Sequence, residues 1–171
     1  MVTTRNLIMC SISIERLMYE TRRKFMDKLS KEQRSWNMSR IRSKDTKPER
    51  IVRSYLYASG VRYRCSPKDV IGKPDICIKR YHLALFVHGC FWHGHSNCKH
   101  FRVPNTNSDF WERKISRNIR RDIEVKTELL RLGYTVYQIW ECELKTNQFS
   151  KLDAFILDYQ RKRQIFDLSS Y

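Results

Sequence analysis

The side chains most able to do chemistry are concentrated in residues 72–98, which read GKPDICIKRYHLALFVHGCFWHGHSNC. An acid opens a short apolar run, a second apolar run follows, and nitrogen and sulfur donors then come close together. The potential metal ligands and proton carriers here are Asp75, His88, Cys90, His93, His95 and Cys98. So many donors around two short strands indicate a functional site rather than scaffold.

A structural zinc site is one reading of the cysteines. Cys90, His95 and Cys98 are soft donors close together in the chain, and structural zinc needs four ligands arranged as a tetrahedron. Cys142, just after a predicted strand, is the best candidate for the fourth. The two internal cysteines that fall inside predicted strands, where a thiol packs as a small apolar group, are Cys65 and Cys77. From ligand types alone zinc is favoured over ordinary core cysteines.

A second, harder metal site is predicted at Asp75. If the runs at 75–79 and 82–89 lie side by side, Asp75 and the backbone at 87–88 converge, and oxygen ligands there suit Mg²⁺. Such an ion can activate water and stabilise the charge that develops at a phosphodiester. A neutral imidazole at His88 or His93 could deprotonate that water. The alternatives are an ordinary turn acid and histidines that bind zinc or pack.

The charge balance points to a polyanionic partner. The 171 residues carry 34 Lys plus Arg against 18 Asp plus Glu, a formal net charge of +16, so nucleic acid is the first candidate and a merely basic surface is the alternative. Flat rings on such a surface can wedge between bases, or they can form a small core beside the zinc loop. The rings concerned are Phe91, Trp92 and Trp111.

Composition and length suit one α/β domain in a reducing compartment. No run of about 18 apolar residues exists and no cleavage site follows 7–14, so we expect a cytoplasmic protein without membrane association. Residues 1–25 carry no assignable pattern and Met26 begins a segment typical of a natural start. We therefore expect an N-terminal extension over 1–25 and a single domain over 26–171.

The predicted elements begin with a short basic helix after Ser30, because Ser30 and Gln33 form a capping-box pattern. This helix runs to Arg42, and its apolar side chains, expected from pattern alone to pack on the core, are Trp36, Met38 and Ile41. A second helix has Pro48 and Glu49 in its first turn and ends at Gly60. The remaining predicted elements are strands at 61–65, 75–79, 82–89 and 134–140 and helices at 110–132 and from 150.

The long helix at 110–132 has two faces of different chemistry. Ile115, Ile119 and Ile123 are spaced by four, with Leu130 two turns further on, and are expected on the buried face. The other face carries a row of cations that either contacts phosphates or is simply solvated: Arg113, Lys114, Arg117, Arg120 and Arg121.

Five segments together resemble the very-short-patch-repair (Vsr) DNA mismatch endonucleases in order and spacing. They are NMSRIRSKDTKPE, GKPD, FVHGCFWHGHSNC, RVPNTNSDFW with its following basic helix, and QIWECEL. The resemblance covers roughly residues 34–145, and HGCFWHGH with the WEC element is highly specific. It implies a fold like the type II restriction endonucleases, a mixed sheet flanked by helices, in a form that lacks the usual catalytic lysine.

The same resemblance implies roles for individual residues. Asp75 would bridge to the catalytic Mg²⁺, His93 would be the general base, and the supporting residues would be His88 and Glu49. The structural zinc ligands would be Cys90, His95, Cys98 and Cys142. Phe91, Trp92 and Trp111 would be inserted beside a T:G mispair from the major groove, with Met38 entering from the opposite groove, which reverses the packing expected for Met38 from pattern alone.

The implied activity is nicking of duplex DNA 5′ to the thymine of a T:G mispair that arises by deamination of 5-methylcytosine. The family pattern also implies a monomer and a functional link to a DNA cytosine methyltransferase. Val87 stands where well-known members have threonine; metal binding there is assigned to the main-chain carbonyl, so reduced tuning rather than inactivity is expected. The rival functions are a zinc-stabilised nucleic-acid-binding module without catalysis and a restriction-type endonuclease acting on fully paired sites.

Overall fold

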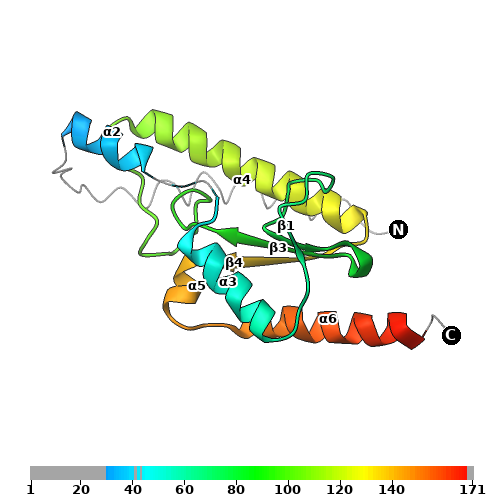
Figure 1. The fold of residues 1–171 in the computed structure, drawn as a ribbon. Coiled ribbons are helices and arrows are strands. Elements are labelled where there is room, and N and C mark those ends of the chain that lie inside the picture. The colour runs from blue at the N-terminus through cyan, green and yellow to red at the C-terminus, as the bar shows by residue number, and fades with distance from the viewer. Residues whose placement is uncertain (1–29, 41, 43, 169–171) are drawn as a thin grey trace.

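The computed structural model describes residues 30–168 apart from 41 and 43, so the expectations for residues 1–25, Met26 and Ile41 lie outside the described residues. The described chain forms a mixed sheet flanked by helices, which confirms the predicted α/β class (Figure 1). In chain order the elements are α2 (Lys31–Ser39), α3 (Lys47–Ala58), β1 (Arg64–Cys65), β2 (Ile76–Ile78), the 3-10 helix η1 (Lys79–Tyr81), β3 (Leu83–His88), α4 (Ser108–Arg131), β4 (Thr135–Trp140), α5 (Glu141–Lys145) and α6 (Ser150–Leu168).

The sheet has four strands in the order β1-β2-β3-β4. The pairs β1/β2 and β2/β3 are antiparallel. The short turn η1 joins β2 to β3, as expected for neighbouring strands of a hairpin. The pair β3/β4 is parallel and runs from Leu83 opposite Thr135 to His88 opposite Trp140. Parallel strands need a long crossover, and α4 supplies it. The carboxyl ends of β3 and β4 therefore meet at one edge of the sheet.

Alternating side chains give the sheet two buried faces. Figure 1 shows α4 on one side of the sheet and α3 and α6 on the other. The core on the α3 and α6 side includes Val52, Leu56, Ile76, Leu83, Leu85, Ile139, Leu152 and Phe155. The smaller core on the α4 side consists of Val70, Cys77, Ala84 and Leu129. Neighbouring strand residues go to opposite faces because successive side chains of a strand point in opposite directions.

The buried face of α4 differs from the expected one. Ile115 and Leu129 are fully buried, but Ile123 and Leu130 are each 52% exposed. A spacing of four residues turns about 400° around a helix, so each step drifts about 40° from the face where it began. A spacing of seven drifts only about 20°, which puts residues 115, 122 and 129 on one stripe. Asp122 therefore lies on the inward face.

The predicted N-terminal helix is present as α2, but it ends at Ser39 instead of continuing to Arg42. The Ser30 hydroxyl accepts the Gln33 amide, and the Gln33 side chain accepts the Ser30 amide at 2.9 Å, which confirms the capping box. The core packing expected from pattern alone for Trp36 and Met38 is wrong, because they are 56% and 39% exposed. Trp36 instead stacks under the Arg40 guanidinium, 3.9 Å from the ring centroid.

The first strand is shorter than predicted. Only Arg64–Cys65 of the expected strand at 61–65 pairs with β2, and Cys65 is exposed, whereas Cys77 packs as a buried apolar group as expected. The helix α5 was not predicted. Among the described helices none combines the length and hydrophobicity needed to cross a bilayer.

Candidate active site and metal cluster

A cavity of about 920 Å³ opens where the ends of β2 and β3 meet the first turn of α3 and the middle of α4. All four predicted catalytic residues line it together: Glu49, Asp75, His88 and His93. Met38 and Trp92 also line it, as does Asp122, which the sequence analysis missed. The cations around it are Arg42, Lys73, Lys114, Arg121 and Lys126. A centre with acids, imidazoles and several cations suits a polyanionic substrate.

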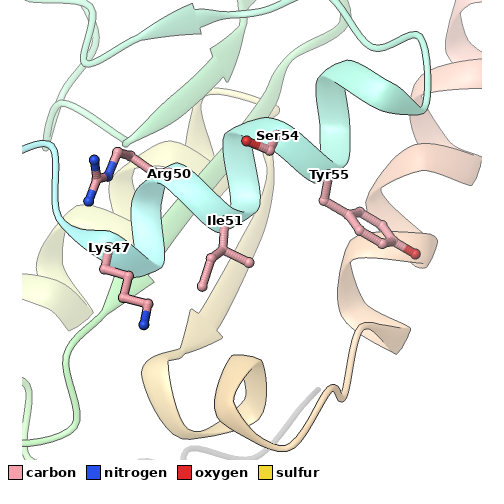
Figure 2. Close-up of a pocket in the computed structure, with 5 residues that line it drawn as sticks. All are labelled: Lys47, Arg50, Ile51, Ser54 and Tyr55. Atoms are coloured by element: carbon pink, nitrogen blue, oxygen red, sulfur yellow. The ribbon is translucent and has the colours of Figure 1, made fainter.

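A second, shallow groove of about 650 Å³ lies along α3. Figure 2 shows Lys47, Ile51 and Tyr55 projecting from the side of α3 that faces α5 and α6. The other residues that line the groove are Arg50 and Ser54. Because this lining contains no carboxylate, imidazole or thiol, the larger cavity is the candidate active site.

Asp75 lies beside the end of β3, as the side-by-side arrangement of the strands predicted. The Val87 amide donates a hydrogen bond of 2.7 Å to Asp75 Oδ2. Burial, with a smaller contribution from the Glu49 charge, raises the pKa of Asp75 to about 6, although the Val87 amide and His93 act to lower it. A buried carboxylate with a raised pKa gains strongly from a nearby cation, because the cation favours its charged form.

His93 forms a pair with Asp122 on α4. His93 Nδ1 lies 2.5 Å from Asp122 Oδ2, and both side chains are about one-fifth exposed. Burial acts to raise the pKa of Asp122, but the hydrogen bond and the charge of His93 outweigh it and lower the pKa overall. The contact fixes the orientation of the His93 ring and leaves Nε2 as the nitrogen available for proton transfer. An acid seven residues after a buried Ile115 was the sequence signal for Asp122.

His88 is stacked on His93 with ring centroids 3.8 Å apart and ring planes at 10°. His88 is 6% exposed, and burial with the nearby His93 lowers its pKa to about 3, so the ring is neutral at pH 7. Its Nδ1 has no hydrogen-bond partner among the described residues. His88, His93 and Asp122 offer ligand atoms within 4.8 Å of one another. Because the two stacked rings lie in nearly parallel planes, the in-plane lone pairs of His88 and His93 do not point at a common position.

The four predicted zinc ligands meet in one cluster. The ligand atoms of Cys90, His95, Cys98 and Cys142 all lie within 4.8 Å of one another, with His95 Nδ1 3.4 Å from Cys142 Sγ. Burial raises the pKa of Cys90 to about 12 and raises that of Cys142, whereas burial lowers the pKa of His95. A bound cation stabilises the thiolates that burial opposes. Three thiols and one neutral imidazole therefore fit a soft divalent metal ion.

The chain reaches this cluster through a close approach to α4. Gly94 has φ +61, and a Cβ there would clash with Ile119 Cδ1 and touch Ile115. Glycine is required both for the left-handed backbone and for the space. Gly94 separates His93 from His95, so this turn directs one imidazole to Asp122 and the other to the thiols.

The predicted wedge residues form an edge-to-face cluster beside the cavity. Trp92 lies 5.1 Å from Phe91 and 5.9 Å from Trp111 between ring centroids, and all three rings are half-buried. Phe110 joins them and is 49% exposed, and Lys114 Nζ lies 5.1 Å from the Trp92 centroid. The rings pack on one another, as a small core would, and their insertion between bases stays a prediction.

A buried carboxylate next to an imidazole–carboxylate pair, within a cavity ringed by cations, is the kind of centre expected of a metal-assisted phosphodiester hydrolase. Comparison with known proteins gives the family. The model of the family described as DNA mismatch endonuclease Vsr matches residues 26–100. The chain belongs to the Vsr family.

Three relatives illustrate the similarity. A type II nicking enzyme of Neisseria meningitidis, V.NmeAIP, is 50% identical over 112 residues, which is 66% of this chain and 79% of that protein. The DNA mismatch endonuclease Vsr of Escherichia coli K12 is 39% identical over 112 residues, 66% of this chain and 71% of that protein. The type II nicking enzyme V.HpaIIP of Haemophilus parainfluenzae is 36% identical over 138 residues, 80% of this chain and 94% of that protein.

Asp75→Asn is expected to stabilise the folded protein at pH 8 when no magnesium is added. The pKa of Asp75 is about 6 in the folded chain, against 3.8 for an ordinary aspartate. Ionisation of Asp75 therefore lowers the stability of the folded protein progressively from about pH 4, and the full loss is reached above about pH 6. The corresponding gain in unfolding free energy is about 1–3 kcal/mol. Urea unfolding at pH 8 and pH 5 measures it, and the gain should shrink at pH 5.

The matched control is Asp167→Asn, which removes an exposed carboxylate in a surface pair on α6 and should change stability little at either pH. A loss of stability in Asp75→Asn at pH 8, or a gain independent of pH, would contradict the assignment of a buried, raised-pKa acid at this position.

Proposed function

We propose that this protein is a Mg²⁺-dependent endonuclease that nicks duplex DNA 5′ to the thymine of a T:G mispair, the product of 5-methylcytosine deamination, and so starts very-short-patch repair. The convergence of Asp75, His93 and Asp122 in one cavity is the observation that carries the proposal. Family membership supports it, since the relatives are described as a DNA mismatch endonuclease and as nicking enzymes.

Each residue around the cavity has a role in this mechanism. Asp75 and the main-chain carbonyl of Val87 would hold the Mg²⁺, which when bound supplies charge neutralisation at the phosphodiester. His93 takes the proton from the attacking water at Nε2 while Nδ1 donates to Asp122, and Asp122 stabilises the imidazolium that forms. His88 remains neutral and supports the His93 ring by stacking against its face. Glu49 adds a second carboxylate beside Asp75 in the cavity.

DNA binding in this proposal uses the basic surface and the aromatic cluster. The cations of α4 and of the cavity rim contact phosphates, and the rings Phe91, Trp92 and Trp111 enter the duplex beside the mispair from the major groove. The exposed Met38 on α2 reaches the duplex from the opposite groove. The enzyme acts as a monomer in the bacterial cytosol, downstream of a DNA cytosine methyltransferase.

The structural metal in this proposal is zinc. Zn²⁺ is favoured by the donor set of Cys90, His95, Cys98 and Cys142, because three thiolates and one imidazole match the tetrahedral structural sites of this metal. We further propose that the sheet with its flanking helices is a form of the restriction-endonuclease-like fold, since an acid at the start of one central strand lies beside the end of the next.

The direct test is a strand-specific nicking assay on end-labelled duplexes that differ only at one base pair. We expect nicking of the T:G duplex with Mg²⁺, none after EDTA, and recovery when Mg²⁺ is restored. Asp75→Asn should bind the T:G duplex without cutting it. Equal cutting of fully paired duplexes would favour the restriction-type alternative, and binding without any Mg²⁺-dependent cutting would favour a non-catalytic module.

Asp122→Asn is expected to lower the nicking rate by about 100-fold or more while leaving DNA affinity within about twofold, because general-base catalysis contributes about 10²–10⁴-fold and the His93 imidazolium would lose its partner. Single-turnover nicking and fluorescence anisotropy measure the two quantities. The control is Glu124→Gln, an exposed acid two residues further along α4. A normal rate in Asp122→Asn would remove Asp122 from the mechanism.

The purified protein is expected to contain about one zinc per chain, and Cys98→Ser is expected to lose it and unfold at a lower temperature. The binding free energy of structural zinc, about 10–16 kcal/mol in model peptides, is available to the folded chain only. Elemental analysis and thermal unfolding give the readouts. Cys65→Ser, an exposed thiol outside the cluster, should retain the metal. Full zinc content in Cys98→Ser would rule out this ligand set.

A further inference from the structure

The second turn of α3 contains an arginine that none of the proposed catalytic steps uses. Arg53 lies one helical turn after Glu49, and its guanidinium Nη2 pairs with the Asp45 carboxylate. Arg53 Nη1 lies 3.9 Å from Glu49 Oε2. The Arg53 side chain is only 25% exposed and that of Glu49 14%, so this contact is better shielded from solvent than an ordinary surface pair.

The three residues form a closed ring of contacts. The Asp45 amide donates a hydrogen bond of 3.0 Å to Glu49 Oε2, the same oxygen that faces Arg53. The Thr46 hydroxyl donates to the other oxygen, Glu49 Oε1, at 2.8 Å. Both carboxylate oxygens of Glu49 are therefore held, and Asp45 is in turn held by Arg53.

This ring is maintained against a backbone cost. Asp45 has φ +53, a left-handed conformation that costs more for Asp than for Gly, although Asp adopts it more readily than most residues with a side chain. The ion pair with Arg53 is a tertiary contact that stabilises that conformation, and the conformation aims the Asp45 amide at Glu49. Strain of this kind persists where the surroundings determine the backbone strongly.

The backbone of Arg53 is held in place by its surroundings. Its carbonyl accepts a hydrogen bond of 3.0 Å from the Tyr63 hydroxyl, and the preceding residue, Val52, is fully buried in the core. A planar guanidinium can face two carboxylates at once and cannot lose its charge at ordinary pH, whereas a lysine ammonium is a single point charge. The geometry therefore specifically suits arginine.

We propose that Arg53, together with Asp45, is a positioning residue that clamps the Glu49 carboxylate in its orientation at the edge of the active-site cavity. The inference rests on the proposed endonuclease function for its effect on rate, but the orientation of Glu49 is a property of the chain itself. Arg53 acts through Glu49 and touches no substrate.

The kinetic test is a double-mutant cycle between Arg53 and Glu49. Arg53→Gln should lower the single-turnover nicking rate at saturating Mg²⁺ by about 10–100-fold, the usual loss when a supporting contact of a metal site is removed, with DNA affinity within about twofold of wild type. In a Glu49→Gln background, Arg53→Gln should cause little further loss of the nicking rate. Arg53→Lys should recover only part of the rate. The control, Arg163→Gln, removes an exposed ion pair between Arg163 and Asp167 on α6 and should leave the rate unchanged.

The second measurement does not depend on activity. In protein labelled with ¹³C at the glutamate carboxyl carbons, the Glu49 resonance, identified by its loss in Glu49→Gln, should shift in both Arg53→Gln and Asp45→Asn and stay in place in Arg163→Gln. A wild-type resonance in Arg53→Gln overturns the clamp, as does a full additive rate loss in the Glu49→Gln background. If wild-type protein does not nick the T:G duplex but the resonance shifts as expected, the clamp stands and the proposed function fails.

Discussion

The parallel pairing of β3 with β4 is the constraint on which both sites depend. In that register His88 lies opposite Trp140, so the two strands end together at one edge of the sheet. The loop at 89–98 follows β3, and α5 begins directly after β4. Residues far apart in sequence thereby become neighbours, and Cys142 completes a cluster whose other three ligands come from the loop.

Trp140 links the Cys/His cluster to the two imidazoles that line the cavity. Its ring is stacked on His95 with centroids 4.0 Å apart and meets His88 edge-on at 5.3 Å. His88 in turn is stacked on His93, so a continuous series of rings runs from the thiol cluster to Asp122. A loop without regular secondary structure would otherwise hold His93 poorly. The contacts within the Cys/His cluster, the ring series and the tight turn at Gly94 together restrain the loop that carries His93.

The cavity concentrates opposed charges in a chain of net charge +16. Asp75 is buried near Glu49 and carries a raised pKa, which is unfavourable for the folded protein in the absence of a cation. His88 is buried with an unpartnered Nδ1 among the described residues. Features that lower stability in this way are common at active sites, where the same charges and polar groups bind the substrate and metal. The surrounding lysines and arginines provide the field that draws a polyanion toward these acids.

Residue order alone was sufficient for most elements, because apolar periodicity, capping residues and glycine stops are local signals. The helices α2, α3, α4 and α6 and the strands β2, β3 and β4 were all expected near their observed positions. The donor-rich loop was also evident, since its ligand types are adjacent in the chain. Met38 shows the limit of local pattern, because periodicity cannot tell whether a helix has a core to pack against.

Pairing across the chain was decided by the tertiary structure. The sequence indicated that β2 and β3 could lie side by side. It did not show the parallel pairing of β3 with β4, the stacking of His88 on His93 or the ion pair of Arg53 with Asp45. Asp122 is the clearest case. Its position seven residues after Ile115 put it on the buried stripe of α4, but only the packing of that helix across the sheet brought its carboxylate to His93, because side-chain contacts depend on relative placement in space.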